Sequence, residues 1–76
     1  MIRHKIVMRQ RILTQENLEG FYAVIADALE KRKYIRYRDV QKMLNVGMVT
    51  AIRICEMLSA QKEDLEYING LLIKVK

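Results

Sequence analysis

The sequence has no proline, three glycines, one cysteine and one histidine among its 76 residues. A single cysteine excludes an internal disulfide, and the apolar, periodic surroundings of Cys55 predict a buried thiol. No apolar run approaches the roughly 18 residues that span a bilayer, so we expect no membrane-spanning segment. Because disulfide and secretion signals are both missing, we expect an intracellular location, either cytoplasmic or nucleoid-associated.

Side chains that support catalysis are equally scarce. One serine, one histidine and no glycine-rich phosphate loop leave little from which to build a reactive site. His4 lies in a basic stretch away from any cysteine or carboxylate cluster, and the adjacent acids Glu63 and Asp64 fit a solvated loop. We therefore expect no enzymatic activity, no metal, no cofactor and no small-molecule substrate.

The residues that are present indicate one small folded domain, because 51% are hydrophobic and 30% are charged. The net charge of +5 is unevenly distributed, since residues 1–13 carry four basic side chains and residues 14–30 carry four acids. Residues 31–42 carry six basic side chains against one acid, whereas residues 43–76 carry four of each. This concentration of positive charge predicts a surface that binds a polyanion, and a solvated surface of mixed charge is the alternative.

A first helix is predicted from about Gln15 to Lys33. Thr14 is a suitable N-cap, and the cations at the end of the segment suit the negative end of the helix dipole. Glycine inside a helix is unfavourable by about 1 kcal/mol relative to alanine, so Gly20 predicts close packing against another element. The apolar positions that recur at helical spacing are Leu18, Phe21, Tyr22, Ile25 and Leu29.

The next five residues, Tyr34–Arg38, contain strong β-formers and predict a short strand. A period of two places Ile35 and Tyr37 on one face and Arg36 and Arg38 on the other. We therefore expect the two guanidinium groups to project together as a clamp for a phosphate.

Two further helices are predicted, separated by a tight turn. Asp39 opens a helix of about two turns, with Lys42 directed outward. The turn Asn45–Gly47 ends it, because asparagine and glycine tolerate left-handed backbone. A third helix spans residues 48–61. Its core-facing stripe consists of Ala51, Ile54, Cys55 and Leu58.

The C-terminal residues predict a β-hairpin. Asn-Gly at residues 69–70, between two runs of β-formers, favours a type I′ turn in which both central residues have positive φ. Such a turn pairs Ile68 with Leu71 and Glu66 with Ile73. Alternation then gives one face with Ile68, Leu71, Ile73 and Val75, and another with Tyr67, Leu72, Lys74 and Lys76.

The order helix, short strand, helix, tight turn, helix and hairpin over residues 15–76 resembles that of the winged helix-turn-helix family. Residues 38–58 are similar to the two-helix unit of that family, and the pair Thr50-Ala51 matches it. The chain departs from the family at Gly47, where a serine is frequent, and at Lys62–Asp64, where a glycine often precedes the wing. The usual packing positions are occupied by Leu44, Val46, Ala51, Ile54 and Leu58.

The resemblance implies an α+β fold with a three-helix helix-turn-helix core and a C-terminal β-hairpin wing. Two parts are expected, a basic N-terminal arm at residues 1–13 and the winged helix-turn-helix domain at residues 14–76. The implied function is sequence-specific or semi-specific binding of double-stranded DNA, as a transcriptional regulator.

In such a complex the helix at 48–61 would lie in the major groove, with Arg53 as the base reader and Thr50 beside it. Basic residues of the strand, arm and wing would contact phosphates. The DNA-binding set that the resemblance implies is Arg36, Arg38, Lys42, Met48, Val49, Thr50, Arg53, Lys74 and Lys76.

A second function fits the same fold. Met48, Val49 and Ile52 leave the outer side of the third helix apolar, and an exposed apolar patch more often marks a protein contact. The alternative is therefore a protein–protein interaction module within a larger complex. RNA binding is a third function, supported by the charge and by four tyrosines that could stack on bases.

The arm at residues 1–13 fits more than one structure. Ile6, Met8 and Ile12 fit a strand, whereas Ile2, Ile6 and Leu13 roughly fit a helix. Its apolar residues could supply a dimer contact, so we expect a homodimer, which suits palindromic half-sites. The alternative is an arm that packs on the first helix or frays.

Overall fold

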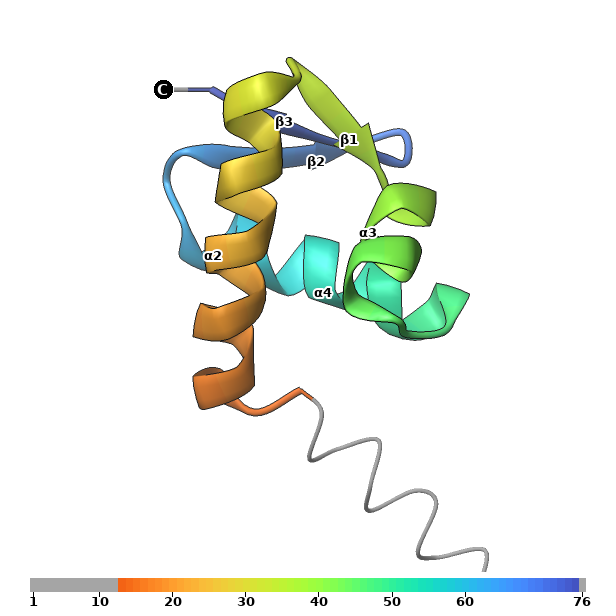
Figure 1. Ribbon diagram of the computed structural model, residues 1–76. Helices are drawn as coiled ribbons and strands as arrows, with labels where there is room; N and C mark the ends of the chain where they lie inside the picture. Colours follow the sequence, from red (N-terminus) through yellow and green to blue (C-terminus); the bar gives the residue numbers. More distant parts are fainter. Residues whose placement is uncertain (1–12, 76) are drawn as a thin grey trace, which may run out of the picture.

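A computed structural model describes residues 13–75, which form three helices and one three-stranded antiparallel sheet (Figure 1). The elements are α2 (Gln15–Lys31), β1 (Tyr34–Arg36), α3 (Tyr37–Leu44), α4 (Met48–Gln61), β2 (Leu65–Ile68) and β3 (Leu71–Lys74). The predicted α+β class and the predicted order of these elements are confirmed. Residues 1–12 of the expected arm and Lys76 of the expected wing lie outside the described residues.

Helix α2 begins where the sequence predicts. The Thr14 hydroxyl oxygen accepts a hydrogen bond from the Asn17 backbone N–H at 3.2 Å, which satisfies one of the unpaired amides of the first turn. The helix ends at Lys31 and not at Lys33, because Arg32 already has extended backbone that leads the chain into β1. Gly20 is exposed and nothing lies within 4 Å of a Cβ built on it, so the predicted close packing is wrong.

The segment between α2 and α3 differs most from the prediction. β1 spans only Tyr34–Arg36, and α3 begins at Tyr37 and not at Asp39. The Asp39 carboxylate accepts a hydrogen bond from the Arg36 backbone N–H at 3.0 Å, which stabilises a helix start at this point. Arg36 therefore ends a strand whereas Arg38 lies in the first turn of a helix. The predicted clamp, with both side chains on one strand face, is wrong.

Helices α3 and α4 are joined by a three-residue turn, and the chain direction changes by 107° between them. Asn45 has left-handed backbone at φ 53 and ψ 51, as predicted for the residue that ends α3. Within residues 13–75, no single helix is long and apolar enough to cross a membrane. Only α3 and α4 taken together reach that length and apolar content, across their bend.

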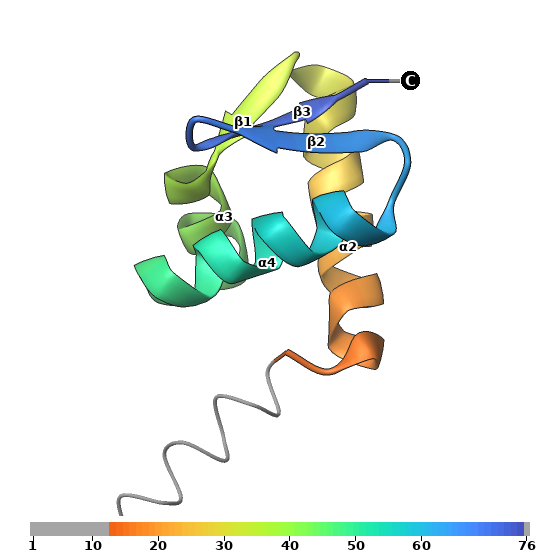
Figure 2. The same ribbon diagram turned by 180° about the vertical axis from the view of Figure 1, so that it is seen from behind.

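The hairpin forms with the predicted register. Ile68 pairs with Leu71 and Glu66 with Ile73, and both turn residues have positive φ, 53° at Asn69 and 79° at Gly70. β3 is the central strand, because β1 pairs antiparallel to its other edge (Figure 2). The Gly70 carbonyl also accepts a hydrogen bond from the Tyr37 backbone N–H at 3.2 Å, so the tip of the hairpin is fastened to the start of α3.

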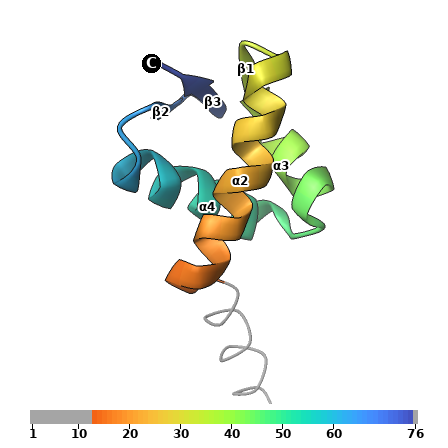
Figure 3. The same cartoon turned by 60° about the vertical axis from the view of Figure 1, so that its left-hand side comes forward.

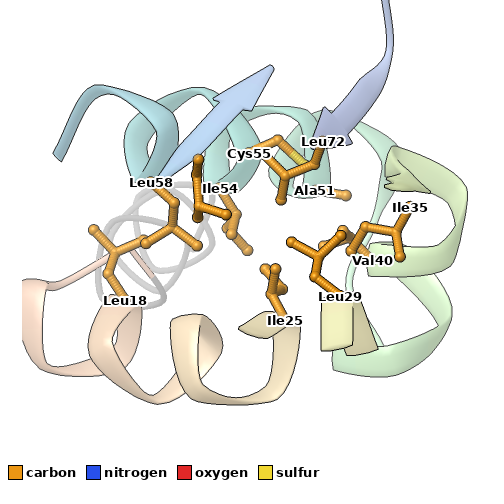
Figure 4. Close-up of a cluster of buried hydrophobic side chains, with 11 residues drawn as sticks. Leu18, Ile25, Leu29, Ile35, Val40, Ala51, Ile54, Cys55, Leu58 and Leu72 are labelled. Atoms are coloured by element: carbon orange, nitrogen blue, oxygen red, sulfur yellow. The ribbon is translucent and has the colours of Figure 1, made fainter. Parts of the chain in front are cut away.

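The core lies between the three helices and one face of the sheet. α2 crosses α4 and also contacts α3 and β1 (Figure 3), so side chains from every element meet in one cluster (Figure 4). The predicted inward stripe of α4 is confirmed, and Leu44 and Val46 are half-buried against the cluster. The buried residues are Leu18, Ile25, Leu29, Ile35, Val40, Ala51, Ile54, Cys55, Leu58, Leu65 and Leu72.

Polar contacts join α2 to the segment between α4 and β2. Lys62 forms an ion pair with Glu19 at 2.9 Å, and its Nζ lies 4.6 Å from the centre of the Tyr22 ring. The Tyr22 hydroxyl donates a hydrogen bond to Asp64 at 2.8 Å, and this bond raises the pKa of the Tyr22 phenol. These contacts fix the point at which the hairpin leaves the helices.

Replacing Gly20 with alanine is expected to stabilise the protein. The position is helical and open, so the new methyl group contacts no neighbour. Alanine also loses less backbone conformational entropy than glycine when the chain folds. We expect the free energy of unfolding to rise by about 0.5–1 kcal/mol in chemical denaturation. Ala23→Gly, an exposed position in the same helix, is the control and should lower it by a similar amount. A loss of stability in Gly20→Ala would contradict the open environment.

Gly70→Val should destabilise the hairpin by about 1–3 kcal/mol, because a β-branched residue resists positive φ. The added Cβ would lie 3.5 Å from the Tyr37 ring, an ordinary contact, so strain in the backbone and not crowding would cause the loss. Asn69→Gly is the control, since glycine accepts the same conformation. An unchanged melting temperature in Gly70→Val would exclude the type I′ turn.

Candidate nucleic-acid interface

The outer side of α4 is formed by residues that the sequence analysis assigned to DNA. Met48 is 51% exposed and Val49 is 65% exposed, and Arg53 is exposed one turn further along. Thr50 is half-buried beside the buried Ala51. The structure therefore brings Met48, Val49 and Arg53 together at the N-terminal part of one helix.

This surface carries little charge. Arg53 and Glu56 are the charged residues of α4, and they lie on the same exposed side of the helix at i, i+3 spacing. Ile52 is half-buried next to them. A duplex would therefore meet a nearly neutral helix, and attraction to phosphates would have to come from neighbouring elements.

Helix α3 supplies basic side chains next to α4. Arg38 and Lys42 are both exposed, and their i, i+4 spacing places them on the same side of α3, one turn apart. Lys42 also borders a shallow hollow between α2 and α3, where the basic Lys31 and Arg32 and the acids Asp27 and Asp39 also lie. The two side chains form a basic row along the helix that precedes α4.

Arg36 lies apart from this row. It is the last residue of β1, and it borders a hollow at the edge of the sheet with Arg32, Lys33 and Tyr34. Arg32 forms an ion pair with Asp39 at 3.4 Å, with both side chains partly exposed. A second group of basic side chains thus surrounds the turn between α2 and β1.

Lys74 also lies apart from α4. It borders a hollow at the C-terminal half of α2, where Asp27, Glu30 and Asp64 also lie. Lys74 also borders a second hollow with the basic residues 31–33 of the α2–β1 turn, and neither hollow includes a residue of α3 or α4. The second wing residue predicted to bind phosphates, Lys76, is outside the described residues.

Lys31, Arg32 and Lys33 belong to the basic segment that is predicted to bind a polyanion, but they are not among the DNA contacts that the resemblance implies. The structure brings all three to the hollows beside β1 and α3. The signal was present in the charge of residues 31–42, where six basic side chains meet one acid. Which of these side chains lie together depends on where α2 ends and β1 begins. The hydrophobic periodicity of the sequence does not fix that position.

Reactive groups in residues 13–75 do not form a site. No group of three or more histidine, cysteine, aspartate or glutamate side chains in this part of the chain could hold a metal ion. Burial raises the pKa of the Cys55 thiol to about 12, so the reactive thiolate is almost absent near neutral pH. Burial also raises the pKa of Tyr67, which is half-buried on the inner face of the hairpin.

Comparison with known proteins gives no further assignment. No protein-family model matches the chain, and neither a curated protein nor a solved structure matches it.

Cys55 should react with a thiol reagent only when the protein unfolds, because the native side chain is buried and its pKa is raised. We expect negligible labelling near neutral pH without denaturant, and labelling that follows the unfolding curve when denaturant is added. Glutathione, measured in parallel at each denaturant concentration, controls for the reactivity of the reagent. Fast labelling of the native protein would contradict the buried position.

Proposed function

We propose that this chain is a winged helix-turn-helix module that binds double-stranded DNA, with α4 in the major groove. The observation that carries the proposal is the pairing of α3 and α4. A change of direction of 107° across a three-residue turn falls within the roughly 90–120° that is typical of helix-turn-helix units. The second helix of such a unit enters the major groove while the first crosses the backbone.

The exposure of α4 supports this arrangement. Its inner side is buried against the core, whereas Val49 and Arg53 are exposed along the outer side. An α-helix fits the major groove of B-DNA, which is about 12 Å wide. Arg53 has the paired donors that recognise guanine, and Val49 and Met48 provide apolar atoms for a thymine methyl group. In the proposed complex, Arg53 is the principal base reader and Thr50 is a secondary contact.

Phosphate contacts are assigned to α3. Arg38 and Lys42 form the basic row on the helix that would cross the backbone, so each can neutralise a phosphate without reading a base. The hairpin would act as the wing beside them, since its tip is bonded to the start of α3. Lys74 is left out of the proposed interface because the hollows that it borders lie beside the C-terminal half of α2 and include no residue of α3 or α4.

The general test is binding to random-sequence duplex DNA, measured by fluorescence anisotropy at several salt concentrations. Phosphate-dominated binding weakens linearly on logarithmic axes as salt rises. We expect that dependence for the wild type, and a slope smaller by about one for Arg38→Ala. Lys74→Ala removes the same charge outside the interface, so it should leave both affinity and slope unchanged. Absent or salt-independent binding would reject the proposal.

A second measurement distinguishes a residue that recognises bases from one that contacts only phosphates. Arg53→Ala should weaken binding by about 1–3 kcal/mol on a selected preferred site and by less on random duplex DNA. Arg38→Ala should weaken binding about equally on both. If Arg53→Ala has equal effects on all sequences, Arg53 is a phosphate contact, and specificity must come from the shape of the DNA.

A protein-interaction module is the second candidate function. The observation that favours it is the exposure of Met48 and Val49 at the start of a helix with only two charged residues. Winged-helix domains can serve either purpose, so the fold does not decide between them. Loss of partner binding in Val49→Lys, in a chain that shows no DNA binding, would support this candidate.

A further inference from the structure

The sheet has a second apolar face, directed away from the helices. Ile35, Leu65 and Leu72 point into the core, so alternation directs their neighbours along each strand to the other side. We call this surface the outer sheet face. It consists of Tyr34 and Arg36 from β1, Leu71, Ile73 and the following Val75 from β3, and Glu66 and Ile68 from β2.

The outer sheet face departs from the usual composition of an exposed surface. An antiparallel sheet that is covered on one side normally alternates apolar residues inward with polar residues outward. Here five of the seven outward residues are apolar or aromatic. Tyr34, Ile68 and Val75 are each 46% exposed, and Leu71 and Ile73 are half-buried between them. A contiguous apolar patch of this kind usually marks an interface.

The two charged residues lie at opposite corners of this face. Strand pairing gives one row that runs Tyr34, Ile73, Glu66 and a second row that runs Arg36, Leu71, Ile68. Arg36 and Glu66 therefore occupy the two ends of one diagonal. The other diagonal runs from Tyr34 to Ile68, and apolar residues fill the centre.

This pattern is self-complementary. When a second copy faces the first across a two-fold axis along the Tyr34–Ile68 diagonal, Arg36 of each copy comes opposite Glu66 of the other. The same operation brings the apolar centre of one face onto that of the other, as an isologous interface requires. Sheets packed face to face in this way lie about 10 Å apart, a spacing that interdigitated side chains fill.

We propose that the outer sheet face binds a second copy of this chain, forming a two-fold symmetric dimer through sheet-on-sheet packing. Apolar burial at the centre supplies the attraction, and the two Arg36–Glu66 pairs at the rim fix the register. The face presents seven residues, fewer than the roughly 20–30 per side of a standard interface, so the dimer should dissociate on dilution to low micromolar concentration. The proposal does not depend on DNA binding, since none of the proposed DNA contacts lies on this face.

The first experiment is sedimentation velocity of the full chain without DNA over a series of concentrations. We expect a reversible monomer–dimer equilibrium for the wild type. Ile73→Lys should raise the dimer dissociation constant by about tenfold or more, because it places a charge at the apolar centre. Val49→Lys, a matched change on α4, should leave that constant unchanged. Circular dichroism melting confirms that both variants remain folded.

The second experiment reverses the rim charges. Glu66→Arg alone should weaken the dimer about tenfold at low salt, because it sets two positive charges against each other. Arg36→Glu alone should weaken it similarly. The double variant, Arg36→Glu with Glu66→Arg, should restore the wild-type constant to within about threefold, since the pairs are exchanged but remain opposite in sign.

Three results would overturn the proposal. One is a wild type that stays monomeric at every concentration. Another is a dimer that survives Ile73→Lys in a folded protein, which would place the contact elsewhere in the chain. The third is failure of the double charge reversal to restore what the single reversals remove, because the two residues would then not face each other.

Discussion

The described fold depends on the central strand β3 and on the burial of Leu72 within it. Leu72 is fully buried and lies between its cross-strand neighbours Ile35 and Tyr67. Through these pairs, β3 joins β1, from the middle of the chain, to β2, from its C-terminal part. Without this strand, β1 would lose its only described pairing partner and α3 would lose the bond from Tyr37 to the hairpin tip. The position of the start of α3 therefore depends on the hairpin.

Some of this arrangement could be predicted because its causes are local. The Asn69-Gly70 turn fixes the register of β2 on β3, since few other residues accept two successive positive φ angles. The bounds of α4 and its core-facing stripe could be predicted from helical spacing, and the burial of Cys55 and Leu58 confirms the stripe. In each case a short stretch of chain contains all the information that decides the structure.

Other features could not be predicted, either because two local signals compete or because distant residues decide them. Tyr37 continues the β-rich pattern of its neighbours, but the Asp39 carboxylate on the Arg36 amide favours a helix from that point. The hairpin is apolar on both faces, so alternation groups Leu71 with Ile73 without showing that Leu72 is the buried residue. Only packing against the helices distinguishes the two faces. The predicted clamp was wrong because of the local helix start, since β1 ends at Arg36 and Arg38 lies in the first turn of α3.

Charge and shape are divided between elements in the proposed DNA complex. α4 has the exposed position of a reading helix but only one basic residue, whereas the basic row of Arg38 and Lys42 lies on α3. Affinity that depends on phosphates would then come from the helix that crosses the backbone, and α4 would contribute shape and apolar contacts. This division suits modest specificity, since phosphate contacts position a protein without reading the sequence.

The proposed dimer and the proposed DNA interface are compatible in space. α4 packs beneath β2, on the opposite side of the sheet from the outer sheet face (Figure 2). Because the two-fold axis lies between the two facing sheets, the two α4 helices lie on opposite outer faces of the dimer. Three layer spacings of about 10 Å, from helix to sheet, sheet to sheet and sheet to helix, would separate them by about 30 Å. The outer side of each α4, which carries the exposed Val49 and Arg53, would therefore stay uncovered in the dimer. Dimerisation through the outer sheet face would leave both proposed DNA interfaces open, one on each face of the dimer.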